Sequence, residues 1–126
     1  MFRAFISMLS LCSIMLLSMV ACSSGASSDA PNSVHMSDTS FTQSSITIKK
    51  GESINLVADT YTPHIIANGT WDGETAKPAI EAGVPQVDKI QTSGNSTTAI
   101  GPFTTAGTFH LYCTVHKGMQ LEVIVQ

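Results

Sequence analysis

The segment LYCTVHKGMQ, residues 111–120, brings three kinds of metal-binding side chain into one loop. Cys113, His116 and Met119 follow one another at intervals of three residues around a Lys-Gly turn. A thiolate, an imidazole and a thioether together suit copper better than other metals. Zinc would favour four firm ligands, usually with more cysteines or a carboxylate. The spacing therefore indicates a copper site that still lacks one nitrogen ligand.

His64 can supply the missing nitrogen from an earlier segment of the chain. It follows Pro63, whose ring fixes its own φ and removes an N–H, so the backbone just before the histidine is well defined. Each candidate also has a simpler interpretation. Cys113 could be a small buried hydrophobic residue, and the two histidines could be ordinary loop residues. Met119 is in phase with the apolar residues of the segment that follows, so it could be a core residue.

The N-terminal segment has the pattern of a secretory signal peptide over residues 1–21. Arg3 precedes a long apolar run that contains serines and no acidic residue, as expected for an export signal. Cys22 follows Ala21 directly, which resembles a bacterial lipobox, in which the cysteine becomes the lipid-bearing first residue of the mature chain. An uncleaved membrane helix or simple secretion are the alternatives. Residues 22–40 are rich in Ser, Asp, Asn and Pro and predict a flexible tether.

The number of cysteines sharpens the interpretation of the loop. The chain has three, and Cys12 and Cys22 belong to the export segment. Cys113 is then the lone thiol of the folded part, whereas small exported domains normally use cysteines in pairs. A lone thiol is buried and inert, joined to another chain, or bound to something.

The charge balance excludes two classes of partner. After removal of residues 1–21 the chain has five lysines, no arginine and nine acidic residues, a formal charge of −4. A nucleic-acid-binding protein needs a basic surface, and attachment to anionic lipid needs a polybasic cluster. We therefore expect no nucleic-acid partner, and membrane attachment through lipid at Cys22 alone.

Residues 41–126 predict a single all-β domain, a sandwich or barrel. Several short runs are rich in β-branched and aromatic residues and end at Gly, Pro or Asn-Gly turns, and none shows a sustained helical period. In the segment before the loop, Phe109, Leu111 and Cys113 share one face of the strand. His110 and Tyr112 lie on the other face, and His110 has no assigned role. Residues 72–95 are irregular. The strand-like runs are SSITIKK, ESINLVAD, PHIIANG, STTAIGPF, GTFHLYC and MQLEVIVQ.

These features together resemble the cupredoxins, the type 1 blue copper proteins. The resemblance rests on Pro-His in an early strand and on GTFHLYCTVHKGM before the last strand, and it covers residues 41–126. The C-x-x-H-x-x-M loop is similar to the compact loop of amicyanin and shorter than that of plastocyanin. The resemblance implies a Greek-key β-sandwich of about seven to eight strands. It also implies one copper ion, Cu(I) or Cu(II), held by His64, Cys113, His116 and axial Met119.

One position departs from the family pattern. Many relatives have Asn directly after the first histidine, where it joins the two ligand segments, but this chain has Ile65. Another group must therefore join the segments, and Thr114 and Asn68 are the candidates.

The resemblance implies a monomeric one-electron carrier on the extracytoplasmic face of a bacterial membrane, in the periplasm or at the cell surface. Redox proteins are expected to dock near His116, with Val115, Pro63 and Pro85 as neighbours. A copper-buffering or copper-delivery protein is the alternative, for which the His35-Met36 pair is the only hint. No nucleophile with a base and an orienting partner argues for an enzyme.

Overall fold

Alternating apolar residues build the facing layers of a β-sandwich. In the computed structural model, which describes residues 29–126, Ile54, Leu56 and Ala58 are buried while the residues between them are partly exposed. The last strand alternates in the same way, because side chains on a strand point to opposite faces in turn. None of the described residues forms a helix that is long and apolar enough to cross a membrane.

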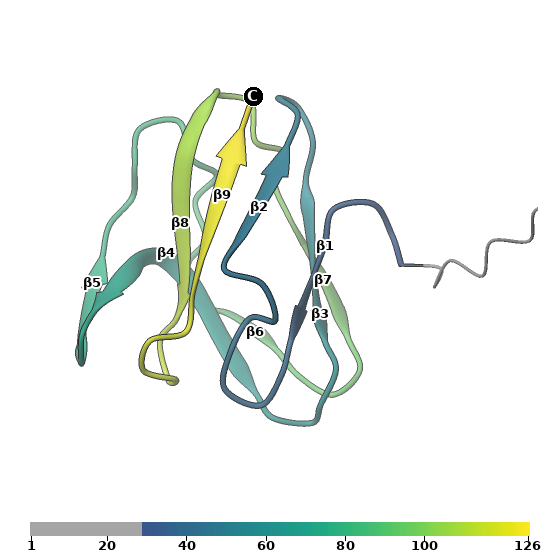
Figure 1. Ribbon diagram of the computed structural model, residues 1–126, viewed down its shortest axis with the longest axis vertical. Helices are drawn as coiled ribbons and strands as arrows, with labels where there is room; N and C mark the ends of the chain where they lie inside the picture. The colour runs from purple at the N-terminus through teal and green to yellow at the C-terminus, as the bar shows by residue number, and fades with distance from the viewer. Residues whose placement is uncertain (1–28) are drawn as a thin grey trace, which may run out of the picture.

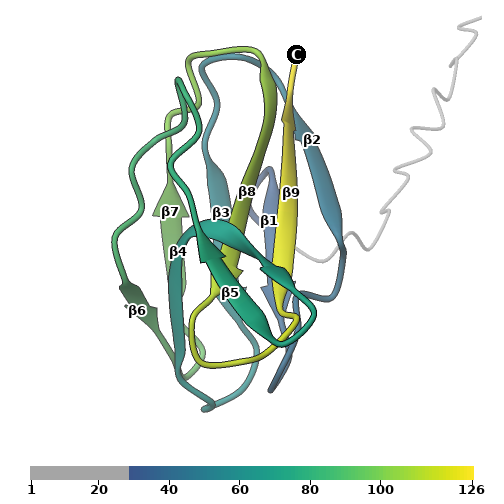
Figure 2. The same ribbon diagram turned by 90° about the vertical axis from the view of Figure 1, so that its left-hand side faces the viewer.

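Two sheets face each other across a single core, as Figures 1 and 2 show. The smaller sheet has the order β1-β3-β7, and the larger sheet has the order β2-β9-β8-β4-β5, with β6 also paired to β4. The chain passes repeatedly from one sheet to the other, as in Greek-key sandwiches. The strands are β1 (Ser33–Met36), β2 (Ser45–Ile48), β3 (Ile54–Ala58), β4 (His64–Asp72), β5 (Thr75–Pro78), β6 (Ile90–Thr92), β7 (Thr97–Ile100), β8 (Gly107–Cys113) and β9 (Gln120–Val125).

The all-β prediction is confirmed. Five of the six predicted runs contain a whole strand, and PHIIANG contains the first part of β4, which continues to Asp72. The described residues hold nine strands, somewhat more than expected, because β5 and β6 lie within the irregular region 72–95 and β1 precedes the predicted domain. The signal peptide, Cys22 and the first residues of the tether lie outside the described residues.

The predicted start of the domain at residue 41 needs correction. Strand β1 pairs in parallel with β3 within the segment 22–40 that was predicted to be a flexible tether. Val34 and Met36 are fully buried in the core. These two apolar side chains, together with the pairing to β3, hold this short, polar-looking segment in the sheet.

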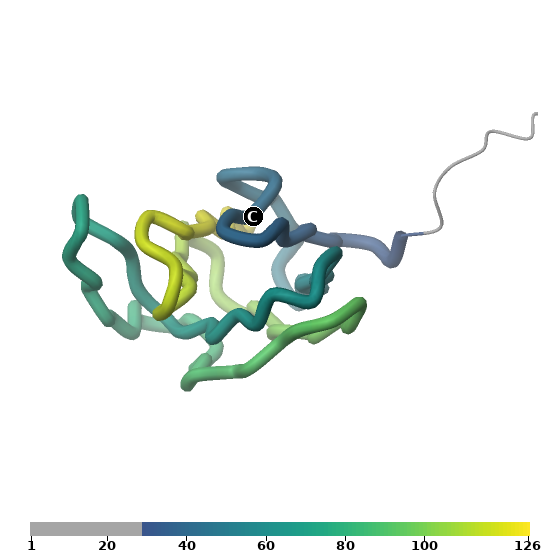
Figure 3. Tube along the Cα trace, turned by 90° about the horizontal axis from the view of Figure 1, so that it is seen from below, coloured from purple at the N-terminus to yellow at the C-terminus, as the bar shows by residue number. Residues whose placement is uncertain are grey.

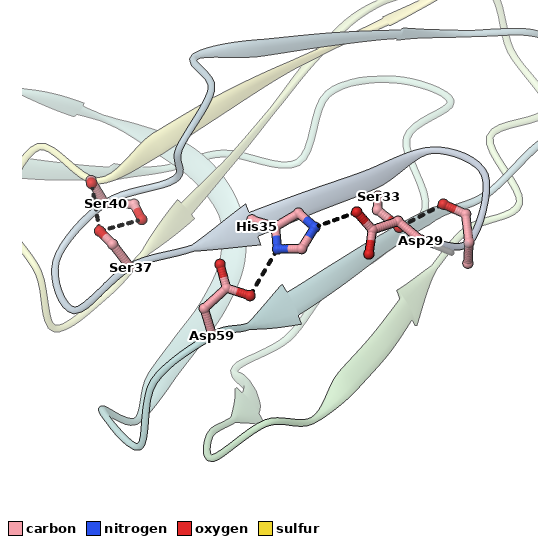
Figure 4. Close-up of polar contacts among 7 residues, drawn as sticks. Asp29, Ser33, His35, Ser37, Ser40 and Asp59 are labelled. Atoms are coloured by element: carbon pink, nitrogen blue, oxygen red, sulfur yellow. Dashed lines mark hydrogen bonds and ion pairs between the residues drawn. The ribbon is translucent and has the colours of Figure 1, made fainter. Parts of the chain in front are cut away.

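His35, on the outer face of β1, is held by two carboxylates. Its Nδ1 lies 2.8 Å from an oxygen of Asp59 and its Nε2 lies 3.3 Å from an oxygen of Asp29, as Figure 4 shows. The hydrogen bond to Asp59 raises the pKa of His35 most strongly, and Asp29 adds to the effect. This arrangement ties β1 to the residue that follows β3.

We predict that His35 stabilises the fold more in weak acid than in base. Because its pKa is raised in the folded state, its contribution is fully present below the unfolded pKa of about 6.5 and is lost as the pH rises through the folded pKa. His35→Gln should therefore lower the free energy of unfolding, measured by urea denaturation, more at pH 5.5 than at pH 8.5. Comparison with the parent chain cancels the titration of the other histidines. An equal difference at both pH values would contradict the prediction.

Candidate metal centre

The pairing of β4 with β8 brings the two halves of the predicted site together. The strands are antiparallel, with Ile66 opposite Cys113. The first residue of β4, His64, and the last residue of β8, Cys113, therefore lie at the same end of the sandwich. Figures 1 and 3 show the segment after β8 and the segment entering β4 at this end.

His64, Cys113 and His116 converge on one point. Their ligand atoms all lie within 4.8 Å of one another, and they form the one such group of His, Cys, Asp and Glu side chains in residues 29–126. The Cys113 sulfur is 3.4 Å from Nδ1 of His116 and 3.9 Å from Nδ1 of His64. The two imidazole rings meet edge to face, with their centroids 5.0 Å apart.

These distances fit a single small metal ion between the three side chains. With metal–sulfur and metal–nitrogen bonds of about 2.3 and 2.0 Å at roughly 120°, the sulfur and nitrogen ligands of one ion lie about 3.7 Å apart. The two observed separations bracket this value. The donors are one thiol and two imidazoles, as the sequence predicted.

Burial prepares His64 to act as a neutral ligand. The ring is inaccessible to solvent, and burial is the main cause that lowers its pKa. The nearby His116 acts in the same direction, while the Ser37 carbonyl and Asp38 act in the opposite one. Metals bind the neutral ring, so the site favours the form of His64 that can coordinate.

The second nitrogen of His64 is the one buried side-chain nitrogen or oxygen in residues 29–126 without a hydrogen-bond partner. The Ser37 carbonyl acts to raise the pKa of the ring, but it does not form a hydrogen bond of normal geometry with Nε2. With Nδ1 facing the thiol, Nε2 is the nitrogen left to carry the proton of a coordinating ring.

Met119, the last residue of the loop, is buried, with an exposed fraction of 2%. The Cys113 amide donates to the Met119 carbonyl at 2.9 Å, and the Met119 amide donates to the His116 carbonyl at 3.2 Å. These two bonds close the loop. Met119 is also part of the hydrophobic core, which agrees with the simpler interpretation of its sequence pattern; its role as the axial ligand stays a prediction.

A backbone bond joins the two ligand segments where many relatives use Asn. The Thr114 amide donates to the Ile65 carbonyl at 2.8 Å, which links the residue after the thiol to the residue after the first histidine. Of the two predicted candidates, Thr114 therefore makes the link, through its backbone.

Asn68 has a different role from the one predicted. Its side chain accepts a hydrogen bond from the Val87 amide at 2.6 Å and donates to the Pro85 carbonyl at 3.1 Å. The side chain is buried at 4% exposure. It thus fastens the irregular segment 79–89 to the middle of β4.

Trp71 was not predicted to take part in the site. Its indole N–H donates to the Cys113 carbonyl at 2.9 Å, and its ring packs edge to face on Tyr112. Tyr112, which the strand pattern placed on the outer face, is buried at 4% exposure. The only sequence signal was that Trp71 is the sole tryptophan of the chain.

His110 lies outside the centre, as predicted. It is partly exposed, its Nδ1 is 2.6 Å from a carboxylate oxygen of Glu81, and its amide donates to the other oxygen of the same carboxylate at 2.8 Å. The nitrogens of His110 face Glu81 and Glu122 on different sides, so these residues do not converge on one ion.

The fold and the thiol–imidazole group define a copper protein of the cupredoxin class. The family model of copper binding proteins described as the plastocyanin/azurin family matches residues 29–126. The chain belongs to this family, and one copper ion is its cofactor. A search of curated proteins finds no match.

Solved structures of similar fold include amicyanins. The chain is 24% identical to amicyanin from Paracoccus versutus (Thiobacillus versutus), covering 81% of this chain and 86% of that one with a TM-score of 0.58. A reduced Cu(I) form of a mutant amicyanin at pH 4 is 18% identical, covers 79% and 86%, and also has a TM-score of 0.58. At these identities the likeness concerns the fold.

We predict that Asn68→Ala lowers the free energy of unfolding by about 1–3 kcal/mol, because it leaves a buried amide and a carbonyl without partners. The measurement is urea denaturation of the metal-free chain. Thr104→Ala, an exposed substitution at the opposite end of the sandwich, serves as the control and should change stability by less than about 0.5 kcal/mol. Equal effects of the two substitutions would show that Asn68 does not fasten the segment 79–89.

Proposed function

We propose that this chain is a one-electron carrier whose copper ion is held by His64, Cys113 and His116, with Met119 as the axial ligand. The observation that carries the proposal is the buried Cys113 thiol at 3.4 and 3.9 Å from two imidazole nitrogens at one end of a sandwich. A thiol and two histidines with a weak axial thioether are the donor set of electron-transfer copper sites.

When bound, copper supplies the exchange of one electron between Cu(I) and Cu(II). The residues of the chain limit how far the site rearranges between the two states, because the two ions prefer different geometries. His64 and Cys113 are held by paired strands, and the loop between Cys113 and Met119 is closed by its own backbone bonds. Complete burial of the thiol and of His64 excludes water from that side.

The alternative function is copper buffering or delivery. The His35-Met36 pair, which suggested it, does not support it. Exchangeable copper sites use exposed Met or His clusters. Met36 is fully buried, and both ring nitrogens of His35 face aspartates. We propose that the chain carries electrons and does not convert a substrate.

The surface beside His116 is the proposed docking site for redox proteins. His116 is partly exposed, and the next two residues of the loop, Lys117 and Gly118, are exposed. Val115 is 53% exposed, and Pro63 next to His64 is also exposed. Pro85 is instead partly buried and tied to Asn68. A small apolar surface around a partly exposed ligand suits the brief, low-area contacts of electron-transfer complexes.

Export and anchoring complete the proposal. The signal-like residues 1–21 and the lipobox-like Cys22 support attachment by lipid to the extracytoplasmic face of a bacterial membrane, in the periplasm or at the cell surface. We propose that the chain acts there as a monomer. The tether is then confined to the residues between Cys22 and Asp29, because Asp29 contacts His35 and the Pro31 carbonyl accepts a hydrogen bond from Asn55.

We predict that the chain with Cu(II) shows an intense visible thiolate-to-copper absorption band and that Cys113→Ser abolishes it, because the sulfur orbital that gives the band is removed. The measurement is a visible spectrum during titration with Cu(II). Any shortened version should begin no later than residue 29, since β1 belongs to the domain.

Cys22→Ser is the matched control. It should keep the band while it abolishes the incorporation of labelled fatty acid into the chain in cells, because the thiol that would carry the lipid is removed. A colourless parent chain, or a band that survives in Cys113→Ser, would contradict the proposed site.

We predict that Val115→Asp slows electron self-exchange about tenfold, since it places like charges face to face when two copies meet at this surface. The measurement is NMR line broadening in mixtures of oxidised and reduced protein. Thr104→Asp adds the same charge at the opposite end of the sandwich and should leave the rate nearly unchanged. Equal rates in the two variants would place the docking surface elsewhere.

A further inference from the structure

We propose that Trp71 is a positioning residue for the copper thiolate, and that the β4–β5 hairpin acts through it as a clasp on the ligand loop 113–119. This inference rests on the proposed function only in naming copper as the ion. The contacts that define the clasp are present in the chain itself.

The clasp depends on a bend in β4. Gly69 has φ of +137°, and a Cβ at this position would lie 2.4 Å from the Lys77 carbonyl oxygen and 2.9 Å from the Tyr112 ring. Only glycine therefore allows the strands to approach so closely while adopting this conformation. Beyond the bend, the tip of the β4–β5 hairpin lies beside the segment that follows β8 in both Figure 1 and Figure 2.

Trp71 contacts both ends of the ligand loop. Its indole N–H donates to the carbonyl of Cys113, the first residue of the loop, at 2.9 Å. Its backbone N–H donates to the side-chain oxygen of Gln120, directly after the loop, at 2.7 Å. One residue thus spans the base of the loop.

The hydrogen bond from the Trp71 indole helps to hold the backbone of Cys113 in place. The amide of Cys113 is already bound to the Met119 carbonyl at 2.9 Å. With the indole on the carbonyl side, both polar backbone groups of Cys113 have partners, which fixes the direction of its Cα–Cβ bond. The edge-to-face contact with Tyr112 keeps the indole in place, since the two ring centroids are 6.0 Å apart.

A third contact between hairpin and loop differs in character. The Lys117 ammonium lies 3.1 Å from a Glu74 carboxylate oxygen, but both side chains are mostly exposed. Exposed ion pairs contribute little, so positioning falls to Trp71. The ion pair therefore provides a matched control on the same hairpin.

Trp71→Phe in the full chain tests the proposal, because it removes the indole N–H and keeps an aromatic ring. In the metal-free chain, hydrogen exchange of the segment 111–120, followed by mass spectrometry, should become about tenfold faster. In the copper-loaded chain, the thiolate-to-copper band should shift, and copper should be released to a competing chelator at about tenfold lower chelator concentration, the usual range for loss of a group that orients a ligand. Glu74→Gln should match the parent chain in all three measurements.

Gln120→Leu provides an independent variant at an exposed position. It removes the acceptor of the Trp71 amide and should also accelerate exchange of the segment 111–120, without affecting the β1–β3 pair. Parent-like exchange and spectra in both variants would overturn the proposal. Acceleration spread equally over β1 and β3 would overturn it too, because Trp71 would then support general stability only. A parent chain without the band would refute the copper site, while the metal-free exchange would still test the clasp.

Discussion

The antiparallel register of β4 with β8 is the constraint on which the rest of the site depends. It places Ile66 opposite Cys113, so the end of one strand and the start of the other deliver a thiol and an imidazole to the same point. A slip by one residue would turn Cys113 to the outer face. Such a slip would also move Phe109 and Leu111 out of the core, which is energetically costly. Hydrophobic packing therefore keeps Cys113 on the buried face.

Hydrogen bonds add to the positioning that the strand register provides. The bond from Thr114 to Ile65 links the ligand segments through the backbone, where many relatives have an Asn side chain. A backbone link is insensitive to the identity of residue 65, which explains how Ile65 is compatible with the site. Asn68 and Trp71 then attach the less regular parts of the chain to the same two strands.

Much of the fold followed from strand patterns that were long enough to interpret. ESINLVAD and MQLEVIVQ alternate clearly, and they form β3 and β9. Strand β1 was missed because Ser33 and His35 surround its two buried residues with polar ones, and only pairing with β3 gives those residues a core to enter. Strands β5 and β6 are short and contain or follow turn residues, so their pairing with β4 outweighs weak local preference.

By itself, the sequence determined the all-β class and the donor types, because alternation and ligand spacing are local properties of the chain. Cys113, His116 and Met119 lie within one loop, and counting cysteines isolated the thiol. Only the tertiary structure decided how His64 reaches them, where the domain begins, and that Trp71 closes the base of the loop. These depend on strand register and on the bend at Gly69, which arise from packing between distant segments that no local pattern records.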